Sequence, residues 1–167
     1  MPRRRSPIAE HELAVAVYTA AGGQETVQRV VTAISRLSRR LDVFYRAQFD
    51  ELRISPGEWS VLQALAGAGR DGDSTPSQLA DLGGVSPSAM THRLDRMAER
   101  GLLRRAPDPG NRTRTRISLT DAGWETFRTA IADADVIESD ILSTLDDRER
   151  RQLAALLEKV VAGLPAH

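Results

Sequence analysis

The chain has 167 residues, of which 41% are apolar and 28% charged, a composition that fits one compact domain and excludes disorder throughout. It contains no cysteine, which excludes disulfides, thiolate zinc sites and thiol-based redox sensing. The three histidines lie too far apart in sequence to form a metal motif, so no metal or other cofactor is expected. No apolar run approaches the roughly 20 residues that span a bilayer, and no leader pattern follows the basic N-terminus. We therefore expect a cytoplasmic protein with no membrane partner.

The N-terminal region is predicted to contain a basic tail and two helices. Residues 1–23 combine a basic, proline-containing start with a short helix over Leu13–Ala20 that ends at two glycines. Residues 24–51 carry apolar residues at alternating spacings of three and four, the pattern of one helix of about seven turns. This stripe comprises Val27, Val30, Ile34, Leu37, Leu41, Phe44 and then Gln48. It packs either on the chain's own core or on a second copy, and we favour the second because such long terminal helices exceed the needs of a small central domain.

Two capped helices follow. Ser55 to Glu58 is a capping box with proline at the first helical position, and its helix ends near Gly67. Residues 67–74 form a loop rich in glycine and aspartate. Thr75 to Gln78 then repeats the capping signature and begins a second, shorter helix.

A third helix follows after a tight turn at Gly83 and Gly84. Ser86 caps it, Pro87 occupies its first position, and Gly101 stops it. Its inward stripe consists of Met90, Leu94 and Met97. Two short helices joined in this way predict a helix-turn-helix.

A β-hairpin is predicted next. Leu102–Arg105 is expected to form one strand, residues 107–111 the turn, and Thr113–Leu119 the returning strand. A hairpin directly after a helix-turn-helix is typical of a wing. Thr120 and Asp121 then begin a long helix, and a last helix opening at Asp146 carries the apolar residues Leu153, Leu156, Leu157, Val160 and Val161.

The zero net charge conceals a segregation of charge. From Val85 to Arg116 there are eight arginines against three acids, whereas from Asp121 to Gly163 ten acids face five bases. The first segment therefore attracts polyanions and the second repels them. The face of the third helix opposite its inward stripe is polar and cationic, as insertion into the DNA major groove requires. Together with the hairpin it gives these predicted DNA contacts: Ser86, Ser88, Thr91, His92, Arg93, Arg96, Arg112, Arg114 and Arg116.

Two acids lie within this basic segment. Phosphate repels Asp95 and Glu99 unless each is paired or accepts a hydrogen bond from cytosine, and we expect them to pair with nearby arginines.

The ordered series of motifs resembles the MarR family of bacterial transcriptional regulators over roughly residues 26–163. The resemblance is carried by Ser55-Pro56-Gly57-Glu58-Trp59, by residues 78–80 and 85–97, by Arg100-Gly101-Leu102-Leu103-Arg104-Arg105, and by Asp108-Pro109 and Leu119-Thr120. It implies a homodimer on pseudo-palindromic DNA that usually acts as a repressor. In one departure, Asn111-Arg112-Thr113 stands where the family commonly has Asp-x-Arg in the wing. The usual wing arginine is therefore replaced.

Many members of this family bind a small effector, often aromatic or anionic, between the dimer helices and the DNA-binding head. The positions at that junction here are Tyr45, Arg46, Phe49 and Trp59, which form either an effector pocket or plain core.

The sequence thus predicts a mainly α protein with a small β-hairpin wing. Its parts are a tail with a short extra helix (1–23), an N-terminal dimerisation helix (24–51), a winged helix-turn-helix head (52–120) and C-terminal dimerisation helices (121–167). The predicted function is sequence-specific DNA binding by a ligand-responsive homodimeric repressor. The alternative is a winged-helix module that binds proteins and has lost DNA binding. An enzyme is not expected, because no nucleophile–base pair, phosphate loop, metal cluster or paired carboxylates stand out.

Overall fold

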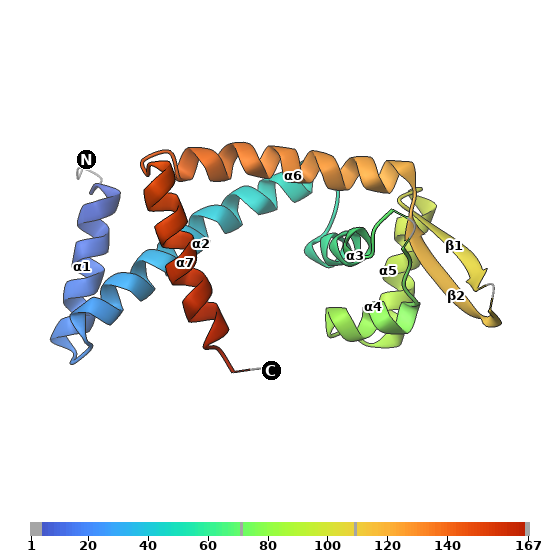
Figure 1. Ribbon diagram of the computed structural model, residues 1–167, viewed down its shortest axis with the longest axis horizontal. Helices are drawn as coiled ribbons and strands as arrows, with labels where there is room; N and C mark the ends of the chain where they lie inside the picture. The colour runs from blue at the N-terminus through green and yellow to red at the C-terminus, as the bar shows by residue number, and fades with distance from the viewer. Residues whose placement is uncertain (1–4, 71, 109, 166–167) are drawn as a thin grey trace. The chain divides into compact units, whose positions relative to one another are not determined.

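A computed structural model describes residues 5–70, 72–108 and 110–165, without the side chains of residues 112 and 113. Its elements confirm a mainly α fold with one antiparallel β-hairpin, drawn as a ribbon in Figure 1. The chain separates into two compact units, Met1–Gln48 and Phe49–His167. Within the described residues, no helix is both long and apolar enough to cross a membrane.

The first unit contains α1 (Pro7–Ala20) and most of α2 (Glu25–Glu51). Helix α1 begins earlier than the sequence analysis predicted, because Ser6 caps it and Pro7 occupies its first position. Glu10 of α1 forms an ion pair with Arg36 of α2 at 2.5 Å, which ties the two helices together.

The second unit opens with three short helices that begin and end close to where their capping signatures predict. They are α3 (Pro56–Gly67), α4 (Pro76–Gly83) and α5 (Pro87–Glu99). Both predicted capping boxes form, at Ser55 and at Thr75. Gly84 ends α4 in the left-handed conformation (φ 59°), which permits the tight turn into α5.

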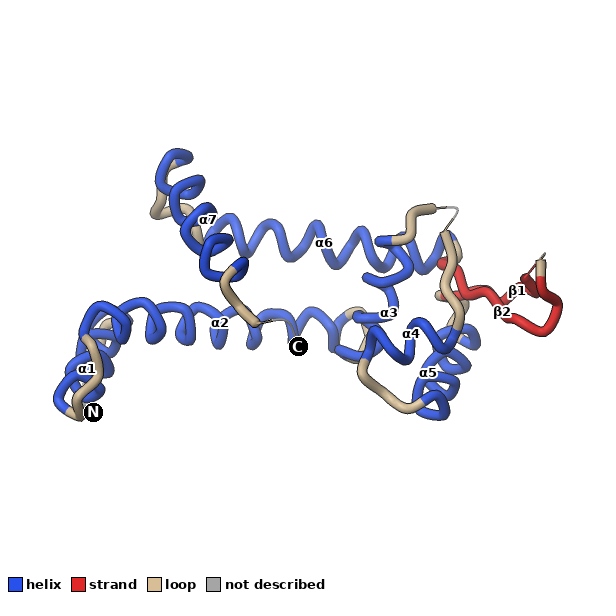
Figure 2. Tube along the Cα trace, turned by 60° about the horizontal axis from the view of Figure 1, so that its bottom comes forward, coloured by secondary structure: helices blue, strands red, loops and turns tan. Residues whose placement is uncertain are grey.

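The hairpin consists of β1 (Leu103–Asp108) and β2 (Asn111–Leu119), the strands coloured red in Figure 2. The turn is shorter than predicted, because Pro107 and Asp108 still pair with β2 across a register shift. Ser74, at the end of the 67–74 loop, forms an isolated antiparallel β-bridge to Ile117, so the end of this loop pairs with β2.

The hydrophobic core of the second unit joins the three short helices to the hairpin. Leu94, Met97 and Ile117 are fully buried, and Leu103 pairs with Leu119 at the base of the hairpin. The remaining members are Ile54, Val61, Leu62, Leu65, Leu79, Ala80, Met90 and Leu102. This core fixes the orientation of α5 and the hairpin relative to each other.

Helix α6 (Asp121–Ile141) packs against α3 and the base of the hairpin, and α7 (Asp147–Ala162) follows it. Thr120 caps α6, and the hydroxyl of the same residue donates to the carbonyl of Gly101 at 2.5 Å. Asp146 and Glu149 form a capping box at the start of α7, where the last helix was predicted to begin. No residue of α7 is buried.

Candidate DNA-binding site

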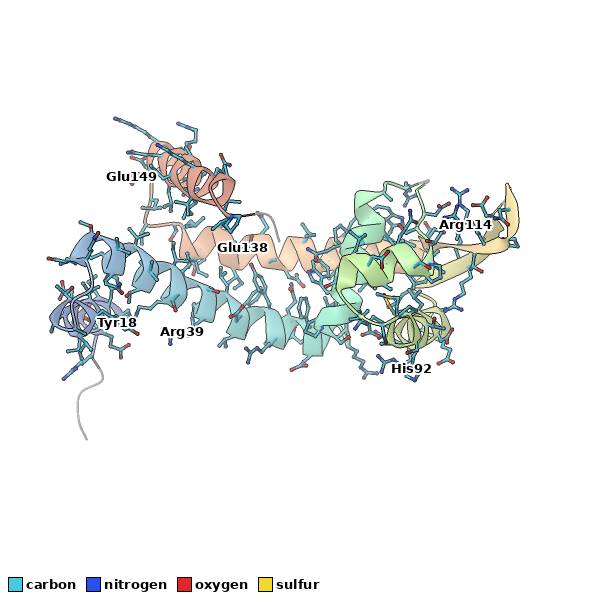
Figure 3. The ribbon with its side chains drawn as sticks, turned by 90° about the horizontal axis from the view of Figure 1, so that it is seen from below. Tyr18, Arg39, His92, Arg114, Glu138 and Glu149 are labelled. Atoms are coloured by element: carbon cyan, nitrogen blue, oxygen red, sulfur yellow. The ribbon has the colours of Figure 1, made fainter. Side chains whose placement is uncertain are left out.

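Helix α5 presents one face to the core and the other to solvent. Met90, Leu94 and Met97 are at most 1% exposed, in agreement with the predicted inward stripe. The residues predicted to face the groove are all exposed: Ser88, Thr91, His92, Asp95 and Arg96. Figure 3 labels His92 on this helix. Because a single helix fits the major groove of B-DNA, the exposed face of α5 has the size and polarity needed for base contacts.

The start of α5 is organised by hydroxyl groups. The Oγ of Ser86 accepts a hydrogen bond from the backbone N–H of Ala89 at 3.3 Å and lies 3.2 Å from the Oγ of Ser88. The hydroxyl of Thr91 donates to the carbonyl of Pro87 at 2.9 Å, so its lone pairs remain available as acceptors. Exposed N–H groups and hydroxyls at a helix start favour contact with DNA phosphate.

Three arginines of the basic segment are engaged by carboxylates. Arg105 Nη2 lies 2.7 Å from Asp95 Oδ1, which confirms the expected pairing of Asp95. The same expectation for Glu99 is wrong for the described arginines, because none of them forms an ion pair with it. Arg100 Nη1 lies 3.2 Å from Oε1 of the buried Glu58. The third is Arg116, whose Nε lies 2.6 Å from Asp73 Oδ2 and 3.9 Å from Asp108 Oδ2. These contacts reduce the charge that the three arginines offer to DNA.

Arg96 and Arg114 differ from these three. Both are exposed, and no carboxylate among the described residues forms an ion pair with either of them. Figure 3 labels Arg114 on the hairpin. The side chain of Arg112, also predicted to contact DNA, lies outside the described residues. Arg96 on α5 and Arg114 on β2 thus keep an exposed positive charge with no carboxylate partner among the described residues.

Arg93, which the sequence predicts as a DNA contact, is packed against a neighbouring helix. It is half-buried, and its guanidinium lies over Gly57 at the start of α3, where a Cβ atom would come within 2.5 Å of Arg93 Cζ. A side chain at residue 57 would displace the guanidinium from this position. Arg93 therefore packs α5 against α3 while remaining partly accessible.

Arg105 and Asp73 are residues that sequence reasoning missed. The sequence pattern predicts a strand at Arg105 and a loop at Asp73, but no role for either side chain. Strand alternation places Arg105 on the same hairpin face as Leu103, which faces the core and α5. That periodicity was the available signal for Arg105, whereas nothing in the sequence indicated that Asp73 meets Arg116.

The residues of the predicted effector pocket fall in both units. In the second unit the rings of Phe49 and Trp59 lie 5.7 Å apart, and Trp59 stacks on Phe127 at 5.3 Å. Trp124 meets Phe127 edge-on at 6.2 Å, which completes an aromatic cluster of α3 and α6 with Phe49. These rings are half-buried against the core.

In the first unit, Tyr45 contacts Phe44 edge-on at 5.7 Å, and Arg46 is exposed. Phe127 and Trp124 were not among the predicted pocket residues.

A capped helix-turn-helix, an exposed polar face on its second helix and an arginine-bearing hairpin together define a winged helix-turn-helix DNA-binding regulator. Comparison with known proteins supports this class and narrows it. A family model described as the MarR family matches residues 54–112.

The similar sequences agree with the family model. The transcriptional regulator PecS of Dickeya dadantii is 33% identical over 131 residues, which cover 78% of this chain and 79% of PecS. The transcriptional repressor MdtR of Bacillus subtilis is 30% identical over 107 residues, covering 64% of this chain and 67% of MdtR. The chain therefore belongs to the MarR family of transcriptional regulators.

Solved structures share the fold. YusO from Bacillus subtilis has a TM-score of 0.73 at 24% identity, over 84% of this chain and 97% of YusO. A mutant of S. aureus MepR bound to an oligodeoxyribonucleotide has a TM-score of 0.64 at 20% identity, over 81% of this chain and 98% of MepR. The winged helix-turn-helix architecture predicted from the sequence is thus confirmed.

Proposed function

We propose that this protein is a homodimeric repressor that binds a pseudo-palindromic operator and releases it when a small effector binds. The observation that carries the proposal is helix α5, whose core face is fully buried while His92 and Arg96 remain exposed. On the hairpin, Arg114 is also exposed and forms no ion pair with a described carboxylate. The fold and the family membership favour DNA binding over the alternative of a protein-binding module. The name of MdtR, a transcriptional repressor, supports repression as the direction of control.

The terminal helices support the dimer. On α2, Val27, Val30 and Ile34 are 44–54% exposed, and on α7 Leu156, Val160 and Val161 are 57–64% exposed. Apolar stripes of this extent are unfavourable in water and mark interaction surfaces. We assign residues 24–51 and 121–167 to dimerisation and residues 52–120 to DNA binding, because two copies related by a twofold axis would bury these stripes and present two heads.

The aromatic cluster supports a small aromatic or anionic effector. Phe49, Trp59, Trp124 and Phe127 are half-buried rather than sealed in the core, and α6 joins them directly to the head. In the second unit we propose Phe49 and Trp59 as contacts of the effector. An effector at this position would change the spacing of the two heads and so reduce the affinity for the operator.

The test is a DNA titration at several salt concentrations, using duplexes from the promoter of the protein's own operon. Affinity is expected to fall steeply as salt rises, because arginine contacts release counterions from the phosphates. Absent or salt-independent binding would disprove DNA binding through the basic face.

Replacement of one α5 residue sharpens this test. His92→Ala should weaken promoter binding by about 1–3 kcal/mol and leave random duplexes almost unaffected if His92 contacts a base. Equal losses on both duplexes would reassign His92 to phosphate.

A further inference from the structure

The ion pair between Asp95 and Arg105 lies at the DNA-binding face. Asp95 is on the exposed side of α5, and its carboxylate lies 2.7 Å from the guanidinium of Arg105 on β1. An unpaired carboxylate at this position would repel the phosphates that the neighbouring Arg96 attracts. In the pair, the charge of Asp95 neutralises the charge of Arg105, which would otherwise be an additional cation at this face.

The fold explains why Arg105 reaches Asp95. Arg105 is opposite the fully buried Ile117 and two residues from the buried Leu103, so its side chain leaves the hairpin on the face that packs on α5. The side chain of Arg105 is 36% exposed and that of Asp95 49% exposed, so the pair lies at the surface rather than in the core. The adjacent Arg104 leaves on the opposite face, where its Nε donates to the Oγ of Ser118 at 2.8 Å. The Asp95–Arg105 pair thus joins the DNA-contacting helix to the wing.

We propose that Asp95 is a specificity-determining residue that withholds Arg105 from DNA phosphate and holds the hairpin in a fixed orientation against α5. A guanidinium freed at this position would bind phosphate on any sequence, since phosphate contacts carry no sequence information. A fixed hairpin, by contrast, favours only the DNA on which α5 and the wing fit together. Asp95 therefore lowers binding to random DNA more than binding to the operator. This inference rests on the DNA binding proposed above, but not on the dimer or the effector.

Glu99 provides a matched control. It lies one turn further along α5, is exposed like Asp95, and forms no ion pair with the described arginines. Glu99→Gln removes the same unit of negative charge as Asp95→Asn without freeing a guanidinium. Any general gain in attraction to DNA appears in both variants, and only the excess in Asp95→Asn reports Arg105.

The experiment measures the affinity of the full-length protein for a random duplex and for a promoter duplex over a salt series. Asp95→Asn should bind the random duplex about three- to fivefold more tightly than Glu99→Gln, with a salt slope steeper by about 0.9, the value for one extra phosphate contact. Binding to the promoter should not increase to the same extent, so the ratio of the two affinities falls. Asp95→Glu, which keeps the charge, should restore the wild-type ratio.

The second arm uses Arg105→Gln. Asp95→Asn should have no further effect on random binding in this background, because its effect requires the freed guanidinium. The inference is overturned if Asp95→Asn resembles Glu99→Gln, if its effect persists without Arg105, or if both duplexes gain equally. If the wild-type protein binds neither duplex, the proposed function fails instead. Thermal unfolding of each variant separates these outcomes from loss of fold.

Discussion

The head and the terminal helices carry the same apolar pattern, but the apolar faces are buried in the head and exposed on the terminal helices. Leu94 of the head is fully buried, whereas Leu156 of α7 has the same spacing within its stripe and is 57% exposed. The head supplies both sides of its core, because α3, α4, α5 and the hairpin converge on one another. The stripes of α2 and α7 have no such complement among the described residues of a single chain. A periodic pattern therefore predicts that a face is buried, but not whether the same chain buries it.

The largest expected effect comes from charging the stripe of α7. Leu156→Asp combined with Val160→Asp should weaken the proposed dimer by about 4 kcal/mol or more, since each apolar side chain loses its burial and each carboxylate would be desolvated. Sedimentation should show monomer at micromolar concentration. Promoter affinity should fall as well, because two half-sites would no longer be bound by one particle.

The matched control for this change places the same charges on the other face. Ala155 and Ala162 lie opposite the stripe on α7, so Ala155→Asp with Ala162→Asp should leave the dimer intact. A dimer that survives the Leu156 and Val160 changes would contradict the assignment of α7 to the interface.

The next effect concerns the self-contained core of the head. A Cβ atom at Gly123 would lie 2.2 Å from the carbonyl oxygen of Leu102, which also accepts the backbone N–H of Thr120 at 3.1 Å. Gly123→Ala should therefore destabilise the head by about 3 kcal/mol in denaturant unfolding, since the backbone of α6 or of Leu102 must shift.

The control for Gly123 is Gly67, the last residue of α3, where an added Cβ meets no atom within 4 Å. Gly67→Ala should be neutral or slightly stabilising. Under conditions where Gly123→Ala remains folded, the Gly123→Ala variant should sediment like the wild type. If this variant loses the dimer, the stability of the head and the dimerisation of the terminal helices are energetically coupled.

Much of the fold follows from local signals, whereas the pairing of side chains does not. Ser55, Thr75, Ser86 and Thr120 mark helix starts because capping involves only the next three residues. Ser6 followed by Pro7 is a helix start of the same kind, and it begins α1 before the predicted start at Leu13.

The missed parts of the site depend on contacts between distant segments. Arg116 meets Asp73 only because the end of the 67–74 loop forms a bridge to β2, and no local pattern encodes that bridge. Likewise, the position of Arg93 over Gly57 depends on how α5 packs on α3. The sequence therefore identifies the arginines of the basic segment, but not which of them form ion pairs or packing contacts.

A smaller effect is expected at Glu58, where one buried carboxylate holds two elements of the head. Its Oε2 accepts the backbone N–H of Ser55 at 2.7 Å, and its Oε1 accepts from Arg100, the residue that ends α5. Glu58→Ala should cost about 2 kcal/mol of unfolding free energy, through loss of the cap and of a partly buried pair. Glu125, paired with Arg128 on the surface of α6, is the control, and Glu125→Ala should cost less than about 0.5 kcal/mol. Equal costs would mean that the contact between α3 and α5 contributes nothing beyond a surface pair.

The smallest expected effect distinguishes two arginines of one strand. Arg114 and Arg116 alternate on β2 and share a face, but only Arg116 is held by Asp73 and Asp108. Arg114→Gln should weaken binding to any duplex about three- to fivefold and lower the salt slope by about 0.9, as expected for one lost phosphate contact. Arg116→Gln should change DNA affinity less and instead lower the unfolding free energy by about 0.5 kcal/mol, the scale of a surface ion pair.

A larger loss of DNA affinity in Arg116→Gln than in Arg114→Gln would mean that Arg116 leaves its carboxylates when DNA binds and that the wing contacts DNA through Arg116. Because Thr113 replaces the arginine common in the family at this position, the result also decides whether Arg114 takes over phosphate binding from the adjacent position. Alternation along β2 places Arg114 on the opposite face from the buried Ile117, so such a contact requires DNA to approach the outer face of the hairpin. If Arg114→Gln has the same salt slope as the wild type, DNA does not approach this outer face.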